Sequence, residues 1–285
     1  MSSTLERHSV AVGDLLVGEG PAVVIGGRVD LRAHHGQVDA HEVLGEHATL
    51  VEPYSAADLP AIAAKADAVV VGSSWTRDIP LVRAAAGLGL PVVVERRASA
   101  SMEEWLELAD YCARAGDGRV LLCEGGRLDL GLMRAARAVS GRPVLADVSR
   151  DVELSAAAVA AGADGLVLDA PGAGSRALEV AEEAVTVVGA LVRPESPTTL
   201  PECRQAIDRV DAALATLLER RAALAGIVQR IKPVGGFEGR DLARERALVA
   251  RMALRAPSLG EERLAPVMNA VIEAGLHLAE ERSSQ

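Results

Sequence analysis

Aromatic side chains are scarce in this chain of 285 residues, which contains two tryptophans, two tyrosines and one phenylalanine. Proteins that bind single-stranded nucleic acids stack the bases on aromatic rings, and so few rings supply no such platform. The formal net charge of −10 also repels phosphate backbones and anionic lipid surfaces. The composition therefore predicts no nucleic-acid partner and no membrane partner, and any site for an anion must gather positive charge locally.

Long apolar runs and abundant cysteine are also missing. No apolar run reaches the roughly 20 residues that cross a bilayer, and the first residues do not combine basic and apolar character as a leader does. We therefore expect a cytoplasmic protein. Cys112, Cys123 and Cys203 form an odd and widely spaced set, which favours buried free thiols over disulfides or metal ligands.

Up to about residue 190, short β-branched runs alternate with alanine-rich helical stretches near 56–65, 78–88, 101–115, 129–139, 152–161 and 175–191. The runs are apolar on both faces, as in parallel strands covered by helices, and they lie at 21–25, 48–52, 67–72, 91–95, 119–124, 142–147 and 164–169. Such βα units predict a TIM-type barrel, with a doubly wound sheet as the alternative. Because a closed TIM barrel has eight strands and seven are visible, we expect an incomplete or modified barrel. Its open edge would be covered by residues 30–48 or by a partner chain.

Three prolines in RPESPTTLP (193–201) end this alternation. They divide the chain into a barrel domain at 1–192, a linker at 193–200 and an all-α domain at 201–285. The overall fold class is therefore α/β, with a helical domain after the barrel.

Three helices are expected in the second domain. Apolar residues recur every three or four positions over 207–231, which predicts one helix of about thirty residues, ~45 Å long. Thr199 and Glu202 form a capping-box pattern at its start. Shorter helices follow near 241–254 and 261–282. The apolar stripe is too long for three helices of this size to cover, so we expect an intertwined homodimer through them.

The long helix carries three cations. Arg221 and Lys232 are eleven residues apart, or three turns, and point within about 20° of each other. Arg204 lies about 25 Å before Arg221 along the axis and on another face. It cannot serve the same small pocket in one subunit, but in a dimer it can reach the pocket of the partner.

The segment GRDLARER (239–246) places Asp241, Arg244 and Glu245 on one helical face. Taken alone, this triplet is typical of a solvated, salt-bridged helix start. Together with the cations of the long helix, it predicts a pocket for a compact dianion that carries a hydroxyl.

The stretches CRQAIDRVDAALATLLERRAALAGIVQRIK and GRDLARER resemble the all-α chorismate mutase family over about 200–282. The resemblance implies conversion of chorismate to prephenate, a rearrangement of one substrate that needs no nucleophile, metal or cofactor. The enzyme restrains the substrate and stabilises negative charge on the breaking ether oxygen.

The resemblance also implies a role for each residue of the pocket. Arg204 from the partner and Arg221 would clamp the carboxylates, Lys232 would donate to a carboxylate and the ether oxygen, and Asp241 and Glu245 would bind the ring hydroxyl beside Arg244.

The third helix departs from this family at two substrate-binding positions. Gly275 stands where the family often has serine, and Ala279 stands where it usually has a glutamine or glutamate facing the ether oxygen. Losing one oriented donor costs about 10²–10³ in rate. The alternatives are a weak mutase, a shifted helix, a mutase for an analogue such as 4-amino-4-deoxychorismate or isochorismate, or a non-catalytic regulatory or docking protein of aromatic biosynthesis.

The first domain resembles the type I 3-deoxy-D-arabino-heptulosonate 7-phosphate (DAHP) synthases over about 8–190. The resemblance is carried by GLPVVVERRASASMEEWLELADYCARAG, RVLLCEGG, RPVLADVSR and AAGADGLVLDAP, and by an opening hairpin in HSVAVGDLLVGEGPAVVIGG. These synthases are TIM barrels that join phosphoenolpyruvate to erythrose 4-phosphate with a divalent metal.

The family's active positions are almost all replaced in this chain. Gly26-Gly27-Arg28-Val29 stands at its metal-binding cysteine, Glu95 at a substrate-binding lysine, and Ser74 and Gly125 at phosphate-binding arginines. Its metal-binding histidine and glutamate are Arg150 and Asp169. Residues 30–48 are also too few for the second βα unit. The resemblance therefore implies a domain without a metal and without DAHP synthase activity.

Several roles remain open for such a domain. One alternative is a relic scaffold. The other is a regulatory or docking module, which either acts on the mutase or binds a separate, active DAHP synthase. Acidic residues end five of its strands, where barrels place their sites, at Glu52, Glu95, Glu124, Asp147 and Asp169. A histidine-rich loop is interpreted as solvated, with a metal site as the alternative, and contains His34, His35, His41 and His47.

Overall fold

The structure is a computed structural model that describes residues 8–18, 20–34, 38–169, 175–193, 197–232, 234 and 236–283. The chain forms two compact units, Met1–Arg209 and Val210–Gln285. The expected linker at 193–200 stays a prediction, since part of it lies outside the described residues. Among the described residues, no helix has both the length and the apolar character that crossing a membrane requires.

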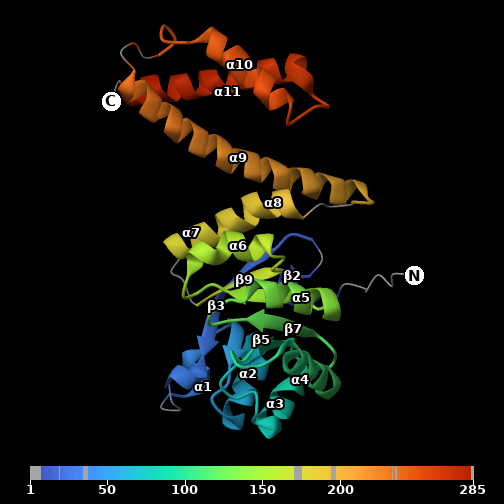
Figure 1. The fold of residues 1–285 in the computed structure, drawn as a ribbon. Coiled ribbons are helices and arrows are strands. Elements are labelled where there is room, and N and C mark those ends of the chain that lie inside the picture. The colour runs from blue at the N-terminus through green and yellow to red at the C-terminus, as the bar shows by residue number, and fades with distance from the viewer. Residues whose placement is uncertain are drawn as a thin grey trace, which may run out of the picture. The chain divides into compact units, whose positions relative to one another are not determined.

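Seven parallel strands form a closed barrel in the first unit (Figure 1). Each pairs with its neighbours in chain order, as β3 (Val23–Asp30), β4 (Ala48–Glu52), β5 (Ala66–Val71), β6 (Val92–Glu95), β7 (Val120–Glu124), β8 (Val144–Asp147) and β9 (Gly165–Asp169). The expected modified barrel with seven strands is therefore confirmed.

The expectation of an open edge is wrong, because β3 closes the barrel by pairing with both β4 and β9. The register with β9 shifts between Ile25 and Arg28, across Gly26 and Gly27. Gly27 has a φ of +80°, which a residue with a side chain rarely adopts. This bulge lets an eight-residue strand bend so that its first half follows β9 and its last residues follow β4.

A short antiparallel hairpin precedes the barrel, as expected, and consists of β1 (Val10–Val12) and β2 (Leu15–Val17). Its buried residues Val10, Val12 and Val17 pack in one cluster with alternate barrel residues such as Ile25 and Leu121. This cluster fills the interior of the barrel with apolar side chains.

Helices cover the outside of the barrel (Figure 1). They are α1 (Ala40–Val43), α2 (Leu59–Lys65), α3 (Ile79–Ala86), α4 (Met102–Ala115), α5 (Leu130–Ser140), α6 (Ser155–Ala160), α7 (Arg176–Glu183) and α8 (Gly189–Val192). Short helical turns join some of them, at η1 (Leu31–His34), η2 (Ala56–Asp58), η3 (Val152–Leu154) and η4 (Ala184–Val188). The helix expected over 175–191 is thus divided, because η4 is a π-helical segment between α7 and α8.

A buried ion-pair group ties the helices to the strands. Asp164 is 1% exposed and accepts two hydrogen bonds of 2.8 Å from Arg137 of α5. It also accepts hydrogen bonds from Arg193 at 3.1 Å and from the Val144 backbone N–H at 2.9 Å. A buried carboxylate with this many donors keeps its charge without water.

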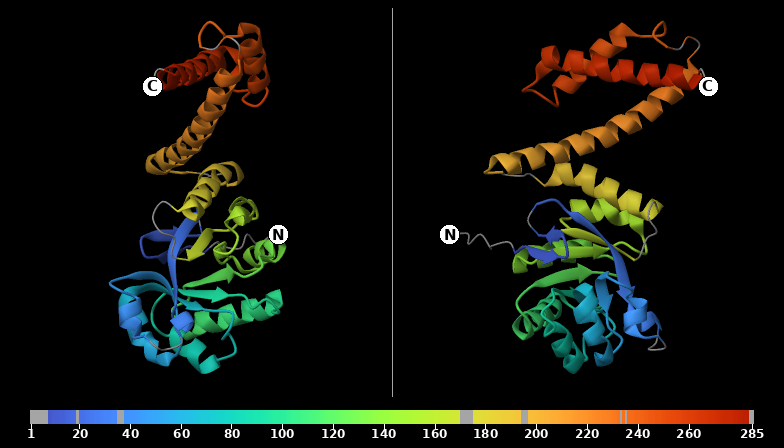
Figure 2. Two further views of the ribbon diagram at one scale, coloured as in Figure 1. Left: turned by 90° about the vertical axis from the view of Figure 1, so that its left-hand side faces the viewer. Right: turned by 180° about the vertical axis from the view of Figure 1, so that it is seen from behind.

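Three helices form the end of the chain, as predicted: α9 (Leu200–Ile231), α10 (Leu242–Ala253) and α11 (Gly260–Ser283). The Glu202 backbone N–H donates to the Thr199 hydroxyl at 3.4 Å and the Thr199 backbone N–H donates to the Glu202 carboxylate at 3.2 Å, which confirms the capping box. Figure 2 shows α10 and α11 side by side, and Val249, Leu264 and Met268 form the small core between them.

The apolar stripe of α9 is largely uncovered within one chain. Ten of its large apolar side chains are 43% to 76% exposed, namely Leu200, Ile207, Val210, Leu214, Leu217, Leu218, Leu224, Ile227, Val228 and Ile231. An exposed apolar stripe of this size is typical of an interaction surface, and the expected homodimer stays a prediction.

The three cysteines are free thiols. Cys112 and Cys123 are buried as expected, and burial raises the pKa of the Cys112 thiol to about 12. Cys203 differs from the expectation, because it lies on the partly exposed first turns of α9.

Candidate functional site

A hollow of about 290 Å³ lies in the helical unit, between α9, the loop before α10, α10 and α11. It brings together six of the eight predicted site residues: Arg221, Lys232, Asp241, Arg244, Glu245 and Gly275. Apolar side chains such as Leu224, Val228 and Leu276 line the rest of it. The hollow therefore combines apolar walls with a few charged groups, as small-molecule sites do.

Two cations reach the hollow from one side, Arg221 on α9 and Lys232 directly after the last residue of α9. Arg221 Nη1 donates to the Val271 carbonyl oxygen of α11 at 3.3 Å, and Lys232 Nζ donates to the Gly239 carbonyl oxygen at 2.9 Å. Each cation uses only one of its donors in these bonds, so the others remain for a ligand. The eleven-residue spacing on one helix places both at the same hollow, as the sequence predicted.

The two carboxylates of the hollow are held by the protein itself. Asp241 is the N-cap of α10 and accepts the Arg244 backbone N–H at 2.9 Å. Glu245 accepts two hydrogen bonds from the Arg240 guanidinium, from Nη2 at 2.7 Å and from Nε at 3.1 Å. Both carboxylates keep free lone pairs that can accept a further hydrogen bond.

Arg240 is a lining residue that the sequence analysis missed. Besides Glu245, it donates to Asn269 at 2.7 Å and to Glu273 at 3.2 Å, both on α11. The hydrogen bonds that Arg240 donates to Glu245 raise the pKa of Arg240 above its ordinary value. Its position just before the N-cap Asp241 gives no helical spacing, so only the folded loop reveals the pairing.

Arg204 and Ala279 are not among the residues that line this hollow. Arg204 is exposed on the first turns of α9, seventeen residues before Arg221. Ala279 lies one turn beyond Gly275 on α11. A side-chain carbon at Gly275 would lie 3.9 Å from Arg221 Nη1, an ordinary contact, so packing does not exclude a small side chain there.

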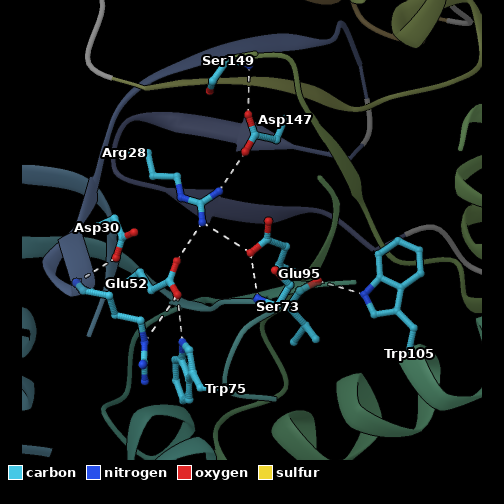
Figure 3. Close-up of polar contacts among 11 residues, drawn as sticks. Arg28, Asp30, Glu52, Ser73, Trp75, Glu95, Trp105, Asp147 and Ser149 are labelled. Carbon is cyan, nitrogen blue, oxygen red and sulfur yellow. Dashed lines mark hydrogen bonds and ion pairs between the residues drawn. The ribbon is translucent and has the colours of Figure 1, made fainter. Parts of the chain in front are cut away.

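A second group of charges lies at the carboxyl ends of the barrel strands (Figure 3). Arg28, just after the β3 bulge, donates to Glu52 at 2.8 Å, to Asp147 at 2.9 Å and to Glu95 at 3.4 Å. These three carboxylates end β4, β8 and β6, so one guanidinium joins four strands of the barrel.

Other donors complete the Arg28 cluster. Glu52 accepts Trp75 Nε1–H at 3.0 Å, and Glu95 accepts the Ser73 backbone N–H at 2.8 Å. Burial works against the charge of Arg28, but the carboxylates, Glu95 foremost, outweigh it and raise the pKa of Arg28. Burial raises the pKa of Glu52, and the charge of Arg28 offsets part of that shift.

The remaining strand-end acids have other surroundings. Glu124 is fully buried and receives two hydrogen bonds from Arg96, at 2.5 and 2.6 Å. Burial, followed by the charge of Asp147, raises the pKa of Asp169. The sequence placed the five acids correctly at the strand ends, but it did not show that arginines bind four of them, which are Glu52, Glu95, Asp147 and Glu124.

The residues present do not fit the divalent metal that the synthase resemblance implies. The Arg28 guanidinium already binds the strand-end carboxylates that would have to act as metal ligands. Its positive charge also opposes the binding of a second cation there. Within the described ranges, no three histidine, cysteine or acidic side chains are grouped so that they could hold a metal. In the histidine-rich loop, His47 pairs with Asp67 at 3.0 Å, and His35 lies outside the described residues.

The raised pKa of Glu52 predicts how the stability of the barrel depends on pH. Because the folded pKa lies above the unfolded pKa, protonation of Glu52 stabilises the fold below its ordinary pKa, and this contribution is lost as the pH rises through the folded pKa. Relative to a Glu52→Gln variant, the free energy of unfolding of the wild type should therefore rise from about pH 7 to about pH 4. Urea denaturation at each pH measures the difference.

A Glu153→Gln change, in an exposed ion pair with Arg176, controls for the loss of one negative charge. A difference between wild type and Glu52→Gln that stays constant or falls as the pH is lowered would contradict this account of Glu52.

Comparison with known proteins finds a similarity for each part of the chain. Residues 203–280 match the sequence profile of chorismate mutase type II. The chain is also 32% identical over 129 residues to the phospho-2-dehydro-3-deoxyheptonate aldolase of Thermotoga maritima. This match covers 39% of the present chain and 38% of that protein, so the chain spans less than two fifths of its curated relative's length.

Solved structures give the same similarity for the barrel. A crystal structure of phospho-2-dehydro-3-deoxyheptonate aldolase (DAHP synthase) from Thermotoga maritima matches with a TM-score of 0.50 and 25% identity, over 57% of this chain and 64% of that chain. A truncated DAHP synthase from the same organism matches with a TM-score of 0.49 and 23% identity, over 62% of this chain and 85% of that one. The chain thus carries a chorismate mutase type II domain at residues 203–280, preceded by a region homologous to DAHP synthases.

Proposed function

We propose that the chain is a chorismate mutase that converts chorismate to prephenate in the hollow of its helical unit. The observation that carries this proposal is the gathering of Arg221, Lys232 and Arg244 around a hollow of about 290 Å³ that also has apolar walls. A dianion binds there in spite of the net charge of the chain, because these cations lie within hydrogen-bonding reach of a ligand.

The reaction needs restraint and charge stabilisation, and the hollow has groups for both. Arg221 and Lys232 hold the carboxylates and fix the reactive conformer. Lys232 also donates to the ether oxygen, where negative charge grows as the bond breaks. Glu245 accepts the ring hydroxyl with a free lone pair while Arg240 keeps its carboxylate oriented.

Gln229 is a candidate for the second donor that Ala279 does not provide. It lines the hollow one turn before Lys232 on α9. Its Oε1 accepts the Gly236 backbone N–H at 2.9 Å, so its amide N–H groups remain to donate to the ligand. A pocket with Lys232 and Gln229 as donors needs no polar side chain at position 279.

The uncovered stripe of α9 supports a homodimer through the helical units. Ten exposed apolar side chains along about 48 Å of helix are more than a monomer keeps in water. In a dimer along α9, Arg204 would reach the partner's hollow and add a cation to it. The site would then be complete only in the dimer.

We further propose that the barrel does not make DAHP. Arg28 binds three strand-end carboxylates, and Glu95 stands where the resemblance requires a cation for phosphoenolpyruvate. An acidic side chain at a phosphate site repels the substrate rather than holding it. The barrel would then act as a scaffold or a ligand-binding module.

Turnover of chorismate by the purified chain tests the mutase. Wild type should consume chorismate, and Lys232→Ala and Arg221→Ala should each lower kcat/KM by about 10²–10³. An exposed cation of α9 outside the hollow, changed as Arg230→Ala, should leave the rate unchanged.

Isochorismate and 4-amino-4-deoxychorismate, assayed in parallel, decide which substrate fits best. The proposal fails if wild type turns over none of the three compounds, or if neither variant slows the reaction.

Mixed dimers test whether Arg204 crosses to the partner. Arg204→Ala and Lys232→Ala should each be inactive, and mixing them after unfolding and refolding should recover about one quarter of the wild-type activity. The recovery arises because half of the dimers are mixed and each contains one intact site. Mixing Arg221→Ala with Lys232→Ala should recover nothing, because both residues belong to the same hollow. Dimers that form without recovery in the first mixture would place Arg204 outside the site.

An assay of DAHP formation tests the barrel. The chain with phosphoenolpyruvate, erythrose 4-phosphate and Mn²⁺ should form no DAHP above the background without protein. Metal-dependent formation of DAHP that Arg28→Ala alters would show that the barrel is catalytic, and the mutase proposal would be unaffected.

A further inference from the structure

A separate hollow of about 200 Å³ lies beside the Arg28 cluster, at the carboxyl ends of β5 and β6. Its polar walls are Thr76, Arg77, Arg97 and Glu104, and its apolar wall is formed by Trp105 and Leu108. Trp105 is buried and donates through Nε1 to the Val94 carbonyl oxygen at 2.9 Å, so this wall is held in place. Barrels place ligand sites at this end of their strands.

The acids near this hollow are already bound within the protein. Glu95, which also borders it, accepts the Ser73 backbone N–H at 2.8 Å and lies 3.4 Å from Arg28. Glu104 accepts the Ser101 backbone N–H at 3.0 Å in the capping box of α4. Neither carboxylate needs a cation from the hollow to satisfy it.

The two arginines of the hollow, in contrast, lack strong partners. Arg97 Nε is shielded from solvent and has no hydrogen-bond partner, although its side chain is 25% exposed. Its Nη2 lies 3.7 Å from Glu104, which is too long for a hydrogen bond. No described residue forms an ion pair with Arg77. A buried donor without an acceptor is costly, and a bound anion would supply that acceptor.

We propose that this hollow binds a compact oxyanion, a carboxylate or a phosphate, between Arg77 and Arg97. The apolar part of the ligand would rest on Trp105 and Leu108. Of the phosphate positions of the synthase resemblance, only Glu95 borders this hollow, and the two cations proposed here, Arg77 and Arg97, stand at none of those positions. The barrel thus keeps a ligand-binding end although its metal chemistry is lost.

Calorimetric titration of the full chain at constant ionic strength tests this site with three probes: inorganic phosphate, succinate and phenyl phosphate. Comparing the affinities for phosphate and succinate shows whether the site prefers a phosphate or a carboxylate. Phenyl phosphate should bind more tightly than inorganic phosphate because its ring contacts Trp105, and it should change the tryptophan fluorescence. Arg77→Gln and Arg97→Gln should each weaken binding by about tenfold or more.

The controls are Arg83→Gln and Arg114→Gln, each of which removes one positive charge from an exposed position, on α3 and α4 respectively. These changes should leave binding nearly unchanged. The proposal is overturned if no probe binds saturably at millimolar concentration, or if the control changes weaken binding as much as the changes in the hollow. Should Arg97→Gln fail to fold in a thermal melt, the exposed Arg77→Gln still decides the question.

Discussion

The need to concentrate positive charge within an acidic chain governs both candidate sites of this protein. With a formal net charge of −10, the molecule as a whole repels anions. An anion is attracted only where cations lie within about a Debye length of it and water is partly excluded. In the helical unit, α9 meets this requirement by presenting Arg221 and Lys232 three turns apart, facing α10 and α11 across an apolar hollow.

The barrel uses the same charges in a different way. Arg28 forms ion pairs with Glu52, Glu95 and Asp147, and Arg96 forms an ion pair with Glu124. These cations therefore hold strands together instead of binding a ligand. This neutralisation lets acidic side chains remain buried at the strand ends without a metal.

The exposed apolar face of α9 gives the helical unit a reason to pair with a second copy. α9 presents apolar side chains along its whole length, and α10 and α11 are too short to cover them. Hydrophobic burial between two copies would therefore stabilise the dimer. In the proposed dimer, burial and catalysis would be linked, because the same helix carries the apolar stripe, Arg221 of its own hollow and Arg204, which is proposed to reach the partner's hollow.

The sequence by itself determined the periodic features: seven strands, the long helix with its capping box, and the three-turn spacing that places Arg221 and Lys232 together. These are local patterns, and the backbone geometry of helices and strands follows from them directly. Only the tertiary structure decided that the bulge at Gly26 and Gly27 closes a seven-stranded barrel, because closure depends on the pairing of β3 with a strand that lies far away in the chain. It alone also revealed that Arg28 and Arg240 bind the acids nearby, since long side chains choose partners by distance in space and not by spacing in sequence.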